Sequence, residues 1–202
     1  MTGELVAETI DAAVNALRRE QQILVTQIQP AKEKAVRAVR GGRKPRARAA
    51  KAKDLALQCA RSLAGLYDPA LRLIPLGPEA EEGAHIGATE TSIDSLQAAP
   101  FLFWAAGATG EPKLREIATH HAETIIPLHL RADGSFIQSS SLDAATGRLV
   151  RHYTHKGVSD TSTWGRAQAW GMLFSTQSWL ADRQREAWIA AAVRGADWWL
   201  VH

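Results

Sequence analysis

The sequence alternates strongly apolar helical segments with amphipathic ones, and it does so as a repeat. The spacing of apolar residues predicts helices over 4–39, 49–66, 91–106, 112–130, 161–180 and 185–201. The segments around Ala60, Ala122 and Ala196 align with one another at offsets of 62 and 74 residues. Repeats of this length are typical of helical hairpins with long loops, which cover one another's apolar faces when they stack.

An inner ring of apolar helices inside an outer ring of amphipathic helices is an α/α toroid. Closing a ring of six hairpins takes about 360 residues at about 60 residues per hairpin, whereas this chain has 202. We therefore predict a mainly α fold, an incomplete six-hairpin toroid that is an open arc, a fragment or part of a larger assembly. The runs 135–142 and 148–154 alternate like strands around a loop that contains Gly147, which predicts one inserted β-hairpin.

The net charge of +3 is unevenly distributed. Residues 32–53 hold ten basic residues and one acidic residue, so this segment is +9 and the rest of the chain is −6. The segment has no aromatic residue that would stack on a base, so we interpret it as a solvated helical face, broken by Gly41, Gly42 and Pro45, and expect no nucleic-acid partner. We predict a domain boundary here: 1–48 is an atypical basic helical segment, and 49–202 is the toroid domain.

Several protein classes are excluded by simple features of the sequence. The single cysteine, Cys59, has no internal disulfide partner. The first twenty residues carry four acidic side chains and no apolar stretch of the signal-peptide type, and eighteen consecutive apolar residues occur nowhere. We expect a cytoplasmic protein without a membrane partner, and we assign it no cofactor and no metal site.

Residues suited to chemistry lie near the predicted N-terminal ends of two inner helices. Asp94 falls in the first turn of one, where a carboxylate often serves only the helix dipole, so its position leaves capping and catalysis both open. The other begins with Ser159–Trp170, in which Trp164, Arg166 and Trp170 place a guanidinium between two indoles. Indoles stack on sugar rings and a guanidinium binds a carboxylate, although core packing also explains the tryptophans.

Five ordered motifs make these residues more specific. Over 52–202 the chain resembles the unsaturated glucuronyl hydrolases, glycoside hydrolase family 88, in the motifs 93–97, 100–106, 133–135, 154–157 and 159–171. The resemblance implies an (α/α)6 barrel acting on oligosaccharides that polysaccharide lyases release. A carboxylic acid protonates C4 of the 4,5-unsaturated uronic acid at the non-reducing end, water adds at C5, and the resulting hemiketal opens to release the next sugar.

The resemblance also implies a role for each matching residue. Asp94 is the acid and base, and a substrate-binding set holds the sugar and its carboxylate: Trp164, Arg166, Trp170, His155, Lys156 and Gln138. Two of these depart from the family, since Gln138 replaces a histidine common in bacterial members and Lys156 replaces a glutamine.

One family motif, a His-Asp-x-Gly-Phe stretch, is missing. No histidine in this chain is directly followed by an aspartate, as that motif requires. Two functions thus stay open. The chain is a hydrolase acting on an unsaturated oligosaccharide, or it is an inactive truncated homologue that serves as a helical-repeat scaffold or a carbohydrate-binding fragment. We expect self-association through its open edge.

Overall fold

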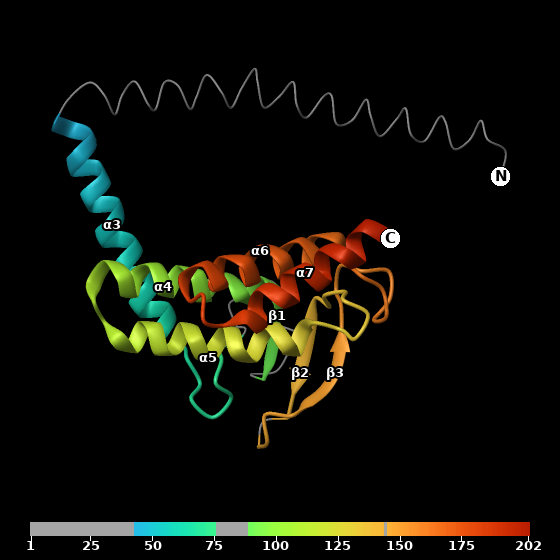
Figure 1. Cartoon of the computed structure of the whole chain (residues 1–202). Helices are drawn as coiled ribbons and strands as arrows, with labels where there is room; N and C mark the ends of the chain where they lie inside the picture. Colours follow the sequence, from blue (N-terminus) through green and yellow to red (C-terminus); the bar gives the residue numbers. More distant parts are fainter. Residues whose placement is uncertain (1–42, 76–88, 144) are drawn as a thin grey trace, which may run out of the picture. The chain divides into compact units, whose positions relative to one another are not determined.

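A computed structural model describes residues 43–75, 89–143 and 145–202 (Figure 1). The chain divides into two compact units, Met1–Leu55 and Ala56–His202. Helix α3 (Arg43–Ala64) begins in the first unit and ends in the second. The helix predicted over 4–39 lies outside the described residues, and the predicted boundary after residue 48 stays a prediction.

Helix α3 begins earlier than the predicted start at residue 49. Pro45 was expected to break the basic segment, but it lies in the first turn of α3, where a backbone N–H has no partner within the helix. Arg48, Lys51 and Lys53 are exposed, which confirms the predicted solvated face for this part of the basic segment.

Helices α4 (Ala98–Thr109) and α5 (Pro112–His129) form the first hairpin of the second unit. Gly110 ends α4 in the left-handed region with φ 76°, a conformation that glycine adopts without a Cβ clash. Pro112 opens α5, as predicted. Apolar residues surround most of α4, whereas α5 is amphipathic; this confirms the predicted pairing of an inner with an outer helix.

The second hairpin consists of α6 (Gly165–Ala181) and α7 (Glu186–Val201), and α6 packs against α4 (Figure 1). Helix α6 begins four residues later than predicted, because Arg131 and the turn that starts at Ser159 hold residues 159–163 in another conformation. Helices α6 and α7 approach closely around Phe136: a Cβ on Gly171 would lie 2.3 Å from the ring, and one on Gly195 would lie 2.9 Å from it.

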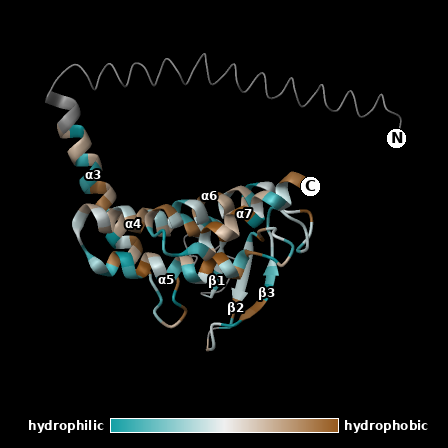
Figure 2. Cartoon of the chain, viewed as in Figure 1, coloured by the Kyte–Doolittle hydropathy of each residue, from teal (hydrophilic) through white to brown (hydrophobic). Residues whose placement is uncertain are grey.

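A small antiparallel sheet in the order β1-β2-β3 lies beside the end of α5 (Figure 1). Its strands are β1 (Glu90–Ser92), β2 (Ser139–Leu142) and β3 (Leu149–Tyr153). The β2–β3 pair confirms the predicted hairpin. Along β3, two apolar residues are followed by polar Arg151 and His152 (Figure 2), and the His152 ring bonds the Leu128 carbonyl at 2.9 Å, which fixes the sheet to α5.

The predicted helix over 91–106 is wrong at its start. Strand β1 and a 3-10 turn, η3 (Ile93–Gln97), precede α4. The three residues of β1 are too few to show a strand period, and their partners lie far along the chain: Ser92 pairs with Ser139.

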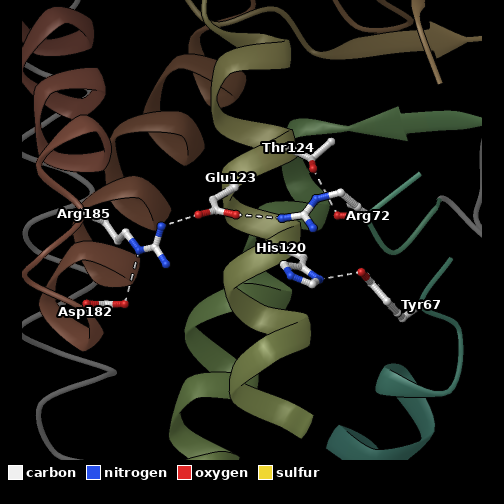
Figure 3. A network of polar contacts seen from close by, with 7 residues as sticks. All are labelled: Tyr67, Arg72, His120, Glu123, Thr124, Asp182 and Arg185. Carbon is white, nitrogen blue, oxygen red and sulfur yellow. Dashed lines mark hydrogen bonds and ion pairs between the residues drawn. The ribbon is translucent and has the colours of Figure 1, made fainter. Parts of the chain in front are cut away.

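Glu123 on α5 is the centre of a polar network that joins three parts of the second unit (Figure 3). Its carboxylate pairs with Arg72 at 2.9 Å and with Arg185, which also lies 3.5 Å from Asp182. These side chains are partly exposed, so each pair contributes little to stability. The network fixes the loop after α3 and the α6–α7 connection against α5.

The predicted repeat holds for two of its three members. Ala60 and Ala122 are both fully buried, and the helix of each is followed by a turn in which an aspartate, Asp68 or Asp133, accepts backbone N–H groups. Ala196 is exposed, so its alignment with the other two is wrong; Gly195 takes the packed position because it lies against Phe136.

Among the described residues no helix is both long and apolar enough to cross a bilayer. Large apolar side chains nevertheless remain exposed on α7, including Trp199, Leu200 and Val201.

Candidate functional site

Asp94 lies half-buried in the first turn of η3. Ser92 precedes it in an extended conformation, and the Ser92 hydroxyl donates to Asp94 Oδ2 at 2.7 Å while accepting the Asp94 N–H at 3.3 Å. Within the described parts of the chain, Oδ1 of Asp94 has no hydrogen-bond partner. The side chain is thus oriented through one oxygen, which leaves the other available to a ligand.

The backbone on both sides of Asp94 is fixed by buried groups. The Gln138 carbonyl accepts the Ile93 N–H at 2.8 Å, and the His121 ring bonds the Ser95 carbonyl through Nε2 at 2.8 Å. Nδ1 of His121 accepts the Ile74 N–H at 3.0 Å, so the ring proton is on Nε2. Full burial lowers the pKa of His121 to about 4, and the ring is therefore neutral near pH 7.

Gln138 holds the Thr154-His155-Lys156 turn beside this position. Its Oε1 accepts the Thr154 hydroxyl at 2.6 Å and the backbone N–H groups of His155 and Lys156 at 3.0 and 3.1 Å. Two of these donors are backbone amides, which establishes which end of the amide side chain is oxygen. Since Gln138 bonds Ile93 through its backbone, this one residue brings together Asp94, His155 and Lys156.

His155 is exposed at the end of β3, and its ring lies edge-on to Tyr153 at a centroid distance of 5.0 Å. Tyr153 is buried and donates to Glu90 at 2.5 Å, and burial raises the pKa of the phenol. Sequence reasoning missed the Glu90–Tyr153 pair because a glutamate in a three-residue strand carries no recognisable signal.

The second group of predicted residues lies at the start of α6. The Arg166 guanidinium lies 4.2 Å from the centroid of the Trp164 ring, in a cation–π contact. A guanidinium stacked in this way keeps its N–H edge free for a carboxylate. The predicted placement of Arg166 between two indoles is wrong for the second indole: Trp170 stacks on Phe174 at 5.1 Å, one helical turn along α6.

Asp94 and the predicted residues at the start of α6 lie on neighbouring elements but do not contact one another. Helix α6 packs against η3, but in the described chain no hydrogen bond or ring contact joins Asp94 to Trp164, Arg166 or Trp170. An apolar cavity of about 640 Å³ lies between η3 and α6, with Ser95, Gln97 and Phe174 in its wall, but Asp94, Trp164, Arg166 and Trp170 are not among its lining residues.

Gln168 within the same motif has a structural role that sequence reasoning missed. The side chain is fully buried; its Oε1 accepts the Phe136 N–H at 2.6 Å, and its Nε2 donates to the carbonyls of Gly134 and Gly195 at 3.3 and 2.9 Å. The available signal was a glutamine between two alanines, Ala167 and Ala169, in the first turns of the helix. No cluster of three metal-ligating side chains occurs in residues 43–75, 89–143 and 145–202.

Two curated relatives are similar to this chain in sequence. It is 40% identical over 80 residues to the unsaturated glucuronyl hydrolase of Bacillus sp. strain GL1, covering 40% of this chain and 21% of that protein. It is 36% identical over 80 residues to the unsaturated chondroitin disaccharide hydrolase of Streptococcus agalactiae serotype III strain NEM316, covering 40% of this chain and 20% of that protein. No protein-family model matches the chain.

The fold of the chain is also similar to a solved structure of this kind. The crystal structure of unsaturated glucuronyl hydrolase from Bacillus sp. GL1 superimposes with a TM-score of 0.67 and 29% identity, covering 75% of this chain and 39% of that chain. The predicted relationship to glycoside hydrolase family 88 is confirmed over part of the chain, and so is the incomplete α/α toroid. The chain spans about one fifth of the length of the curated relatives it matches.

Proposed function

We propose that this chain carries part of the site of an unsaturated glucuronyl hydrolase, with Asp94 as its acid and base. The observation that carries the proposal is the setting of Asp94: a half-buried carboxyl group with one oxygen held by Ser92, next to the turn that Gln138 fixes. A carboxyl group held in this way on a rigid turn suits proton transfer to a bound substrate.

The proposed reaction is hydration of an enol ether. Asp94 gives its proton to C4 of the 4,5-unsaturated uronic acid, and the oxygen of a water molecule bonds C5 while the proton released by that water returns to the Asp94 carboxylate. The C5 hemiketal then opens to a ketone, which leaves a hemiacetal at C1. This hemiacetal collapses to an aldehyde as its hydroxyl proton passes to the glycosidic oxygen, and the next sugar leaves as an alcohol. The double bond is hydrated without displacement at the anomeric carbon, so a single acid and base is sufficient and paired carboxylates are not needed.

Recognition of the acidic sugar falls to the residues around Asp94. Arg166 offers the forked guanidinium that suits a carboxylate, with Trp164 beneath it. His155 and Lys156 lie exposed on the turn held by Gln138, where Lys156 adds a positive charge. We infer that the substrate is a lyase-generated oligosaccharide with an unsaturated uronic acid at its end, the class named for the chondroitin disaccharide hydrolase of Streptococcus agalactiae.

A carbohydrate-binding role without turnover is the second candidate, and a specific observation favours it. The family's second aspartate motif is absent from the sequence, while the residues suited to bind sugar are present. The same alternative, an inactive homologue, includes a helical-repeat scaffold that does not bind sugar.

One experiment separates these functions. The purified chain is incubated with an unsaturated chondroitin or hyaluronan disaccharide, the absorbance of the C4–C5 double bond is followed, and binding is measured by calorimetry in parallel. Loss of absorbance supports the hydrolase. Binding without loss of absorbance supports the carbohydrate-binding fragment, and the absence of both contradicts the hydrolase and leaves the scaffold.

A further inference from the structure

Arg131, directly after the end of α5 and its cap at Leu130, binds a segment that lies some thirty residues further along the chain. Its Nη1 donates to Thr163 Oγ1 at 3.1 Å, and its Nη2 donates to the carbonyls of Asp160 and Ser162 at 3.3 and 3.1 Å. A fourth bond, from Nη1, reaches Ser135 Oγ at 3.2 Å. All four partners are neutral oxygens, so this arginine holds the path of a loop and is not simply one half of an ion pair.

The segment 154–163, which we name the recognition loop, is folded on itself. Asp160 Oδ1 accepts the Thr154 N–H at 3.1 Å, so the first residue of the recognition loop is joined to its second arm. A Cβ on Gly157 would lie 2.5 Å from Ser162 Oγ and 2.7 Å from Thr154 Cγ2, which shows that the two arms are in close contact. Gln138 holds the first arm and Arg131 holds the second.

The backbone of Arg131 is itself well anchored. Its N–H donates to the Ser135 carbonyl at 2.8 Å, and its carbonyl accepts from the Arg194 guanidinium of α7 at 3.0 Å. Hydrogen bonds thus run without a break from α7 through Arg131 to Thr163, the residue before Trp164. The planar guanidinium of Arg131 is essential, because its Nη1 and Nη2 donate in fixed directions to different partners. A lysine ammonium on a flexible side chain does not reproduce this arrangement.

We propose that Arg131 is a positioning residue, which fixes the recognition loop so that Trp164 and Arg166 are preorganised for the carboxylate of the sugar; this rests on the proposed function. Arg131 does not touch the substrate. It acts through the loop, and its contribution is therefore made to substrate binding and not to the proton transfer at Asp94.

The test uses Arg131→Lys in the full chain, with Arg61→Lys as the matched control. Arg61 of α3 donates to Glu111 and takes no part in the hydrogen bonds that hold the recognition loop. In Arg131→Lys we expect amide hydrogen exchange of residues 154–163 to become about tenfold faster, because protection depends on how often a segment opens. We expect the KM for an unsaturated disaccharide to rise about tenfold with kcat changed less than about threefold. Arg61→Lys leaves both values near those of the wild type.

A second variant approaches the same loop from its other arm. Gly157→Ala forces a Cβ against Thr154 and Ser162 without touching Arg131, and we expect it to change exchange and KM in the same direction. It keeps the test decisive if Arg131→Lys does not fold.

The outcomes are distinguishable. Two results for Arg131→Lys would overturn the positioning role: a lower unfolding temperature with unchanged KM, or unchanged amide exchange in the recognition loop. A residue that only stabilises the fold would not raise KM while leaving kcat nearly unchanged. If the wild type binds the disaccharide and Arg131→Lys binds it equally well, only the positioning role fails. If the wild type neither binds nor hydrates the disaccharide, the proposed function fails and the positioning role fails with it.

Discussion

Arg166 and Lys156 give the site two cations of different geometry. Arg166 is fixed by its stacking on Trp164, whereas Lys156 lies on an exposed turn. A planar fork binds a carboxylate through two parallel hydrogen bonds, which an ammonium group does not reproduce. We therefore expect Arg166→Lys to raise the KM for an unsaturated disaccharide more than Lys156→Gln does, as measured by initial rates. A larger effect of Lys156→Gln would mean that the carboxylate site is wrongly assigned.

Two buried histidines make the stability of the fold depend on pH. Burial lowers the pKa of His121 to about 4 and that of His129 to about 3. As the pH falls below the ordinary histidine pKa of 6.5, the unfolded chain takes up protons that the folded chain does not. The free energy of unfolding therefore falls between pH 6.5 and 4, by about 1.4 kcal/mol per pH unit for each histidine.

This prediction is checked by denaturant unfolding at several pH values from 7 to 4.5. His121→Gln removes one titrating group and should reduce the slope of the free energy of unfolding against pH. Equal slopes for the wild type and His121→Gln would contradict the assignment of His121 as a neutral buried ring.

At the scale of single residues, the sequence indicates candidate site residues but does not predict their contacts. Asp94 and Arg166 were identified from their motifs. The role of Gln138 could not be predicted, because its oxygen accepts from one hydroxyl and two backbone N–H groups 16 to 18 residues away, contacts that only the folded chain reveals. Arg131 was missed for the same reason.

The helices that could be predicted have a regular spacing of apolar residues and a recognisable first residue. Helix α5 begins at Pro112 and keeps a regular apolar face, and α7 was also predicted closely. Strand β1 was not predictable, because its three residues are stabilised by pairing with Ser139–Ser141 rather than by a local pattern.

The contact of α6 with Phe136 gives a prediction about packing. Gly171→Ala places a Cβ 2.3 Å from the Phe136 ring in a buried position, and overpacking of this kind lowers the free energy of unfolding by about 1 to 3 kcal/mol. Gly107→Ala in α4 is the control: its Cβ would meet no atom within 4 Å, and replacing a helical glycine stabilises by up to about 1 kcal/mol. Thermal unfolding of both variants tests this, and a stable Gly171→Ala protein would show that the helices separate easily.

For the molecule as a whole, the exposed apolar side chains of α7 predict self-association. Leu200 is 83% exposed and Val201 is 76% exposed, and burying each large apolar side chain contributes about 1.5 to 3 kcal/mol. We expect sedimentation velocity to show association that increases with concentration, and the double variant Leu200→Lys, Val201→Lys to weaken it. A wild-type chain that sediments as a monomer at every concentration would contradict this expectation.

The toroid itself was predictable because its repeat is visible in the sequence, in the alternation of α4 with α5 and of α6 with α7. The register of the repeat was predictable only in part. Ala196 matched the other repeats by residue type, but the close approach of Gly195 to Phe136 sets the packing of α7.

The central claim is that Asp94 supplies and recovers the proton, and Asp94→Asn tests it most directly. Asparagine keeps the volume of the side chain and an oxygen that accepts from Ser92, so the unfolding temperature should match that of the wild type. With an unsaturated chondroitin disaccharide as substrate, the loss of double-bond absorbance should slow by about 10² to 10⁴-fold, while Asp197→Asn, an exposed carboxylate on α7, has no effect. An Asp94→Asn protein that turns over substrate within a few-fold of the wild-type rate would show that Asp94 is not the acid.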